Sequence, residues 1–343
     1  MKARTILAVV TIAALFSAPF SFAADDEIGI FEMLHASSVS FEETTSVLEA
    51  SLAKSALVLH ATHDVRVPEA RHKARVYVLT SPSYAAAAAS EPARTISAQV
   101  LRLAVFTQGD SQATYINMAN PVAHAMVYYA NSSDYDAMIK AAAGAAGEIR
   151  NAVADVPGKA MSVQAEPMRS EKHYRKFKGD GPARMMAKFR TFEKSQLVIA
   201  EDGATSFDDV VARVEAAVAR SKVTGAEDSQ GWEPVATIRL RDDAVYIGVT
   251  NPYIEDKMVR INSRFRKDGK SEASPYPGVD HVTALPTDVL VIREDDRTLV
   301  LHYGQMWRMQ LYFWDSGYRA FTANVGVPSK IANSIEDTIN ESP

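Results

Sequence analysis

Residues 40–55 read SFEETTSVLEASLAKS, and residues 206–221 read SFDDVVARVEAAVARS. Both stretches place a serine three residues ahead of an acid, which is the pattern of a capping box at the start of a helix. Acids in the first turn also suit the positive end of the helix dipole. Apolar residues then recur at helical spacing in both stretches. The sequence therefore predicts two amphipathic helices that begin in the same way.

The agreement continues beyond these helices. The segment VYVLTSP at 76–82 matches VYIGVTNP at 245–252 with one residue of slip, and both predict a strand closed by a proline-containing turn. Residues 100–115 and 288–303 each read as strand, turn and strand, which predicts a β-hairpin. Three matched elements in the same order predict a duplicated domain.

Short strands and helices in this order predict an α+β fold, in which each copy is a two-layer α/β sandwich. Each domain is expected to hold a small antiparallel or mixed sheet with helices packed on one face. Closing helices are expected at 135–153 and 329–339, and a basic stretch with a Gly-Asp-Gly-Pro break predicts a linker. The predicted organisation is a signal peptide at 1–23, a first domain at 24–158, a basic linker at 159–194 and a second domain at 195–343.

The N-terminus has the pattern of an export signal. Lys2 and Arg4 precede a short apolar run at 6–16, and residues 21–23 read SFA, with small residues at the −3 and −1 positions, which predicts cleavage near Ala23. A membrane-spanning helix needs about 20 apolar residues, more than this run supplies. We therefore expect a periplasmic or secreted protein with no transmembrane segment in the mature chain.

The composition excludes several classes of site. Apolar residues make up 47% of the chain, which is enough for packed cores. The absence of cysteine excludes thiolate metal sites, thiol nucleophiles and disulfides. A net charge of −5 argues against nucleic acid as a partner, because neutralising phosphates requires a basic surface.

A family resemblance rests on the same motifs. The SFEE helix start after a strand, the strands that follow, the turn at Asn251-Pro252 and the hairpin at 288–303 resemble the DUF302 domain. The first copy carries the opening motif more closely, and the second carries the Asn-Pro turn. The resemblance covers most of both halves, but neither the linker nor the segment between Glu255 and Pro286. It implies a tandem arrangement of this fold and identifies no catalytic residues.

Motifs for catalysis are missing. The sequence has no GxSxG elbow, no phosphate-binding GxxxxGK[ST] loop, no HExxH motif and no dinucleotide-binding glycine pattern. The acidic pairs Asp242-Asp243 and Asp295-Asp296 fall in predicted turns, where neighbouring carboxylates are normally solvated. An enzyme is therefore not favoured, and a hydrolase with an unrecognised site is a distant alternative.

Histidine and methionine gather after the hairpin of each copy. Imidazole and thioether ligands favour Cu(I), so a copper site is one hypothesis. The candidate ligands are Met118, His124 and Met126 in the first copy, and His302, Met306 and Met309 in the second. The alternative is ordinary packing, because methionine commonly fills apolar cores. In that interpretation the spacing of two from Trp307 to Phe313 predicts a buried strand face with Met309 inside and Met306 on the other side.

Other segments offer further candidates. Trp307, Tyr312 and Trp314 could stack on a ligand or a partner, or fill the contact between the two domains, which is the favoured interpretation. The basic stretch at 169–194 could contact an anionic lipid or an acidic partner, although a solvated linker leading into a short helix is preferred. His60 and His63 are too few for a metal site without a third ligand.

The sequence favours an exported, non-enzymatic binding or accessory protein of unknown ligand, with no cofactor. Two similar domains can share a groove, and binding sites are common at domain interfaces. The expected partner is a small molecule or another periplasmic protein. The main alternative is a periplasmic copper-handling protein that uses the His and Met clusters.

Overall fold

The fold is described from a computed structural model of the chain. The structure describes residues 27–68, 72–109, 111–176, 192, 196–221, 231–261, 278–314 and 317–340. The predicted signal peptide at 1–23 lies outside these residues, as does most of the basic stretch at 169–194 beyond residue 176. Below, residues 27–176 are called the first half and residues 196–340 the second half.

The first half alternates strands and helices. Its elements are β1 (Glu27–Ser37), α1 (Phe41–Leu52), β2 (Val58–Asp64), β3 (Ala74–Thr80), α2 (Pro82–Ala87), the 3-10 helix η1 (Ala93–Gln99), β4 (Leu101–Gln108), β5 (Ala113–Ala119), α3 (Pro121–Tyr128), α4 (Tyr135–Val153), β6 (Gly158–Ser170) and α5 (Glu171–Lys176).

The second half follows a closely similar order. Its elements are β7 (Gln196–Asp202), α6 (Phe207–Ser221), β8 (Glu233–Arg241), β9 (Ala244–Thr250), α7 (Pro252–Val259), the 3-10 helix η5 (Val279–Ala284), β10 (Thr287–Glu294), β11 (Arg297–Tyr303), α8 (Gln305–Phe313), α9 (Gly317–Ala323) and α10 (Val327–Asn340).

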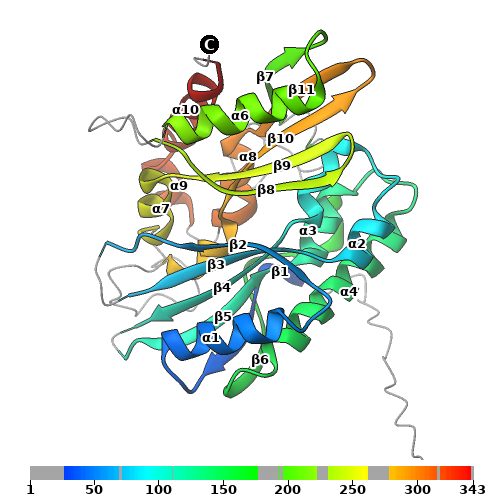
Figure 1. The fold of residues 1–343 in the computed structure, drawn as a ribbon. Helices are drawn as coiled ribbons and strands as arrows, with labels where there is room; N and C mark the ends of the chain where they lie inside the picture. The colour runs from blue at the N-terminus through cyan, green and yellow to red at the C-terminus, as the bar shows by residue number, and fades with distance from the viewer. Residues whose placement is uncertain are drawn as a thin grey trace, which may run out of the picture.

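Each half builds one antiparallel sheet. The first sheet has six strands in the order β2-β3-β4-β5-β1-β6, and the second has five in the order β7-β11-β10-β9-β8. All neighbouring strands run antiparallel, so neither sheet is mixed. In Figure 1, α1 lies below the first sheet and α6 above the second, with both sheets between them. The predicted α+β class is confirmed.

The two helix starts quoted first are capped as predicted. The Ser40 hydroxyl accepts a hydrogen bond from the backbone N–H of Glu43 at 3.2 Å. The Ser206 hydroxyl accepts from the N–H of Asp209 at the same distance of 3.2 Å. These bonds satisfy backbone donors that have no partner inside the helix, and so fix where α1 and α6 begin.

The halves share the order of their first five strands in space. In each sheet the third strand of the half pairs with the second and fourth, and the first strand pairs with the fifth. A short helix with proline in its first turn follows the third strand in both cases, as α2 and α7. This common arrangement is what a duplication would produce, and the duplication itself stays a prediction.

The structure differs from the expected boundaries at residue 158. Strand β6 begins there and pairs antiparallel with β1 over most of its length, so residues 158–170 form the edge of the first sheet. The predicted linker starts at 159, because the polar composition of this segment does not indicate a strand. The first sheet thus extends to residue 170, well into the predicted linker.

The predicted strand from Trp307 to Phe313 is wrong, because these residues lie in helix α8. Residues 121–128, which carry His124 and Met126, are also helical, as α3. Every residue of α3 is buried, so no polar face marks it as a helix. The closing helices are confirmed as α4 and α10. Among the described residues, no helix has the length and apolar character needed to cross a membrane.

Two glycines provide a test of how closely β6 packs against β1. A Cβ at Gly29 in β1 would overlap the backbone of Ala165 in β6, whereas a Cβ at Gly144 in α4 would meet nothing within 4 Å. We expect Gly29→Ala to lower the free energy of unfolding by about 1–3 kcal/mol through overpacking. Gly144→Ala should raise it by about 0.5–1 kcal/mol, because alanine favours the helix. Urea denaturation measures both, and equal effects would contradict the close approach of β6 to β1.

Candidate functional site

Each half packs its 3-10 helix against the sheet of the other half. Helix η5 of the second half packs on β4 and β5, and η1 of the first half packs on β10 and β9. The corresponding edge strands β2 and β8 contact each other. This reciprocal arrangement is that of an approximate two-fold axis between the halves, as in a symmetric dimer.

Charged side chains lie buried at this interface. Arg102 in β4 and Asp288 in β10 are each 1% exposed, and their Nη1 and Oδ1 atoms are 3.8 Å apart. Tyr246 donates its hydroxyl proton to the same carboxylate oxygen at 3.0 Å, and Nη1 of Arg308 lies 3.6 Å from it. Two guanidiniums thus share one carboxylate, which leaves one positive charge uncompensated within this group.

Strand register places Arg102 and Asp288 at corresponding positions of the two halves. Arg102 pairs with Val78, two residues before the end of β3, and Asp288 pairs with Gly248, two residues before the end of β9. The strand pairing can be followed through the β4–β5 and β10–β11 hairpins into α3 and α8, and it places His124 and Arg308 at corresponding positions as well. Because Arg102 and Asp288 correspond and also contact each other, the approximate two-fold axis passes near them.

A hydrogen-bonded chain extends from Arg102 into helix α3. Arg102 donates to the Tyr312 hydroxyl at 2.8 Å, and that hydroxyl lies 2.9 Å from Nε2 of His124. Because arginine can only donate, Tyr312 can give its own proton to His124. Burial, followed by the charges of Arg102 and Arg308, holds the pKa of His124 well below its ordinary value. His124 is therefore neutral, and the local field is positive.

The predicted aromatic candidates separate in the structure. Tyr312 lies at the interface. The guanidinium of Arg102 is 5.5 Å from the centre of its ring, and that of Arg308 is 5.4 Å from it. Trp307 also reaches the first half, with its ring 5.8 Å from that of Tyr128. Trp314 is half-buried and packs against Phe321, 5.5 Å away. Trp307 and Tyr312 thus help fill the contact between the halves.

The two predicted metal clusters lie mostly on helices. His124 and Met126 are two residues apart on α3, which turns their side chains by about 200° relative to each other. His302 is in β11 with Nε2 3.0 Å from a carboxylate oxygen of Glu336. Met118 is buried in β5, Met306 is half-buried on α8, and Met309 lines a pocket described below. No group of three or more His, Asp or Glu side chains in the described part of the chain could hold a metal ion.

His63 has a partner that the sequence did not indicate. Its Nε2 lies 2.6 Å from Oε1 of Glu255 in α7, and the buried Glu255 carboxylate also accepts from the backbone N–H of Arg66 at 2.8 Å. Although burial opposes ionisation, these hydrogen bonds outweigh it and lower the pKa of Glu255. The hydrogen bond between His63 and Glu255 joins β2 of the first half to α7 of the second. His60 bonds Thr80 instead, at 2.8 Å.

Arg169, at the start of the predicted basic stretch, is also buried at the interface. It donates to the backbone carbonyls of Gln310 and Leu311 at 2.7 and 3.2 Å. Farther along this stretch, Met185, Met186 and Phe189, which are spaced as on one side of a helix, lie outside the described residues.

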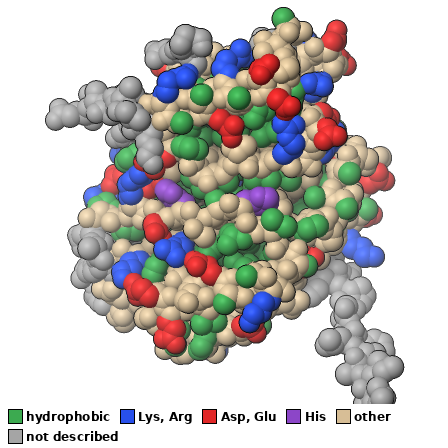
Figure 2. All heavy atoms as spheres, in the orientation of Figure 1, with side chains coloured by type: hydrophobic (Ala, Val, Ile, Leu, Met, Phe, Trp, Pro, Cys, Tyr) green, Lys and Arg blue, Asp and Glu red, His purple; other side chains and the backbone are tan. Residues whose placement is uncertain are grey.

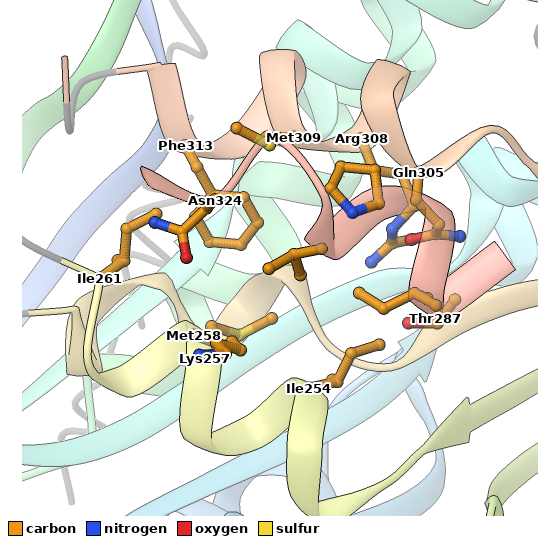
Figure 3. A pocket seen from close by; sticks show the side chains of 13 residues that line it. Ile254, Lys257, Met258, Ile261, Thr287, Gln305, Arg308, Met309, Phe313 and Asn324 are labelled. Carbon is orange, nitrogen blue, oxygen red and sulfur yellow. The ribbon is translucent and has the colours of Figure 1, made fainter. Parts of the chain in front are cut away.

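A pocket opens within the second half. It holds about 610 Å³ of space, part of it open to solvent, and its walls come from α7, α8 and α10, with Ile261, Asn324 and the first residue of β10. Figure 3 shows Arg308, Gln305 and Thr287 together in one part of the pocket, apart from Ile261 and Asn324. Apolar side chains make up most of the lining, among them Ile254, Met258, Met309, Phe313 and Ile331.

Two residues that line this pocket each carry a buried polar atom without a hydrogen bond. The atoms are Nη1 of Arg308, on a residue 5% exposed, and Oγ1 of Thr287, on a residue 1% exposed. A buried donor without a partner is costly, and such groups normally pair with protein, water or ligand. By contrast, the amide of Gln305 donates to the backbone oxygen of Tyr303 at 2.9 Å. The pocket therefore combines apolar walls with unsatisfied donors at one end.

Sequence reasoning missed the residues that matter here. Arg102, Asp288, Thr287 and Arg308 belong to no motif. One signal was available, since Arg102 interrupts the apolar run VLRLAV and Asp288 stands at the matching point of TDVLVI. A charge inside a strand that is otherwise apolar on both sides indicates a buried ionic contact.

We expect the negative charge of Asp288 to stabilise the interface by balancing Arg102 and Arg308. Asp288→Asn leaves the guanidiniums of Arg102 and Arg308 buried without a counterion, so the free energy of unfolding should fall by about 3–5 kcal/mol. Asp295→Asn, in the exposed β10–β11 turn, should change it by less than about 0.5 kcal/mol. Urea denaturation distinguishes these results. Adding Arg102→Met to Asp288→Asn should restore part of the loss, and strict additivity would contradict the shared ion pair.

The lowered pKa of Glu255 leads us to predict that the free energy of unfolding depends on pH. Because its pKa is lowered on folding, its contribution is present above the ordinary carboxyl value of 4.5 and lost as the pH falls through the lower folded value. Glu255→Gln should therefore cost about 1–3 kcal/mol at pH 7 and progressively less as the pH falls below 4.5. Unfolding in urea over a series of pH values from 7 downward measures this. Glu233→Gln, which removes a more exposed partner of Arg66, serves as the control, and a pH-independent difference for Glu255→Gln would contradict the ion pair.

Comparison with protein families, with curated proteins and with solved structures finds no significant match to this chain.

Proposed function

We propose that the chain is a non-enzymatic binding protein that holds a small organic molecule in the pocket between α7, α8 and α10. The observation that carries this proposal is the pocket itself, which is lined mainly by apolar side chains and includes two buried polar residues, Arg308 and Thr287. Ligand sites in proteins are concave and mostly apolar, with a few polar groups that orient the ligand.

The position of the site differs from the groove expected between the domains. At the interface, Arg102, His124, Trp307 and Tyr312 are at most 2% exposed, so the contact between the halves is filled. Every residue that lines the pocket belongs to the second half. Binding is therefore assigned to one half, with the interface as its support.

The first half fills the corresponding space. Helices α2 and α7 both begin with proline, and alignment on that proline matches Tyr84 with Ile254. Alignment of His124 with Arg308 matches Tyr129 with Phe313. Tyr84 and Tyr129 are buried, with ring centres 6.5 Å apart. Two phenol rings thus stand where the second half has smaller or more separated side chains.

The wider setting is also part of the proposal. A signal peptide at 1–23 would place the protein in the periplasm or outside the cell, and the tandem arrangement would make it a DUF302-type protein. Copper handling has less support, because His124 is bonded to Tyr312 and His302 to Glu336. On the face drawn in Figure 2, acidic and basic side chains are interspersed.

Two methionines on α8 allow a matched test. Met309 lines the pocket and Met306 does not. Met309→Trp should fill the pocket and weaken binding of an eight-carbon probe such as octanoate at least tenfold, whereas Met306→Trp should leave its affinity unchanged. Isothermal titration calorimetry on the two purified variants and the wild type measures this. Equal affinity in all three proteins, or no heat in any of them, would contradict the proposal.

A further inference from the structure

We infer that the ligand of this pocket is a small amphipathic anion whose charged head group lies on Arg308 and Thr287. This inference rests on the proposed binding function and specifies the chemical class of the ligand. The head group is a monoanion such as a carboxylate, and the remainder of the molecule is an unbranched or lightly branched apolar chain.

Two donor groups at the polar end of the pocket have no hydrogen-bond partner, although the amide oxygen of Gln305 also belongs to a residue at this end (Figure 3). Nη1 of Arg308 and Oγ1 of Thr287 make no hydrogen bond with any described residue, and both side chains are more than nine-tenths buried. Arginine can only donate, and a threonine hydroxyl can donate as well. A ligand that satisfies both must therefore present oxygen acceptors at this end.

The charge at this end is positive. Arg308 lies at this end, Lys257 lines another part of the pocket, and no acidic side chain lines it among the described residues (Figure 3). The nearest described carboxylate to Arg308 is Asp288, which Arg308 shares with Arg102 at 3.6 and 3.8 Å. Burial, and after it the charges of the same two guanidiniums, lowers the pKa of His124. An anionic head group would supply the missing charge.

The number of free donors limits the head group. Nη1 of Arg308, which lies 3.6 Å from Asp288 without a hydrogen bond, and the Thr287 hydroxyl match the two oxygens of a carboxylate or sulfonate, because Nη2 of Arg308 already donates to the carbonyl of Ala284 at 2.6 Å. A phosphate monoester carries more charge and more acceptors and is normally held by several backbone N–H groups or more than one arginine. The site is therefore built for a single negative charge.

The rest of the lining selects the body of the ligand. Met258 and Met309 provide flexible thioether chains that adapt to different shapes. Ile254, Phe313 and Ile331 add branched and aromatic surface. A polar body such as a sugar would leave its hydroxyl groups unpaired on these walls, which is unfavourable. An aliphatic chain of medium length suits them.

The test uses three probes of equal length, octanoate, 1-octanol and octylammonium, titrated into the purified protein by calorimetry. Octanoate should bind at least about tenfold more tightly than octanol, since a hydrogen-bonded charge contributes that much, and octylammonium should bind most weakly. Equal affinity for octanoate and octanol, both lost in Met309→Trp, would overturn the inference and leave the binding function standing. Failure of all three probes would overturn both.

Variants locate the head group. Arg308→Met should reduce octanoate affinity to that of octanol while leaving octanol unchanged. Thr287→Val, which keeps the shape and removes only the hydroxyl, should weaken octanoate several-fold, and it decides the matter if Arg308→Met does not fold. Lys330→Met removes a cation from the exposed side of α10 and should have no effect. An equal loss in Lys330→Met and Arg308→Met would show that net charge, and not this site, attracts the anion.

Discussion

The contact between Arg102 and Asp288 fixes how the two halves can associate. The two groups are buried, 3.8 Å apart, and stand at corresponding positions on either side of an approximate two-fold axis. If the halves were identical, the same axis would bring two like charges together in a region of low dielectric, which is strongly unfavourable. The interface therefore requires halves that differ at this position, and it could not form between two copies of either half alone.

Local signals in the sequence were sufficient for much of the fold. The serine caps and the acidic β10–β11 turn depend on neighbouring residues, so they could be predicted. Helix α8 could not, because Trp307, Arg308, Gln310, Leu311 and Tyr312 are all buried and surround the helix axis. Without an exposed face the 3.6-residue period disappears, and a spacing of two among a few apolar residues suggests a strand. The same reason applies to α3, in which every residue is buried.

The candidate site depends on contacts between residues far apart in the chain. Thr287 and Arg308 come together only because η5 leads into β10 while α8 packs against α10 and η5. No spacing in the sequence encodes such a contact. The differences between the halves are more informative, since the buried rings of Tyr84 and Tyr129 stand at the positions that Ile254 and Phe313 take in the second half. This difference in side chains at corresponding positions supports the proposal that the ligand lies in the second half.

Arg308 belongs to both the pocket and the interface. One of its nitrogens donates to Ala284, while the other faces the carboxylate shared with Arg102 and makes no hydrogen bond. Asp288 must therefore balance two cations when the pocket holds no anion. An anion on Arg308 would relieve this imbalance, so occupancy of the pocket would stabilise the same buried charges that join the halves. By linkage, a ligand that binds only the folded chain then strengthens the association of the halves as well.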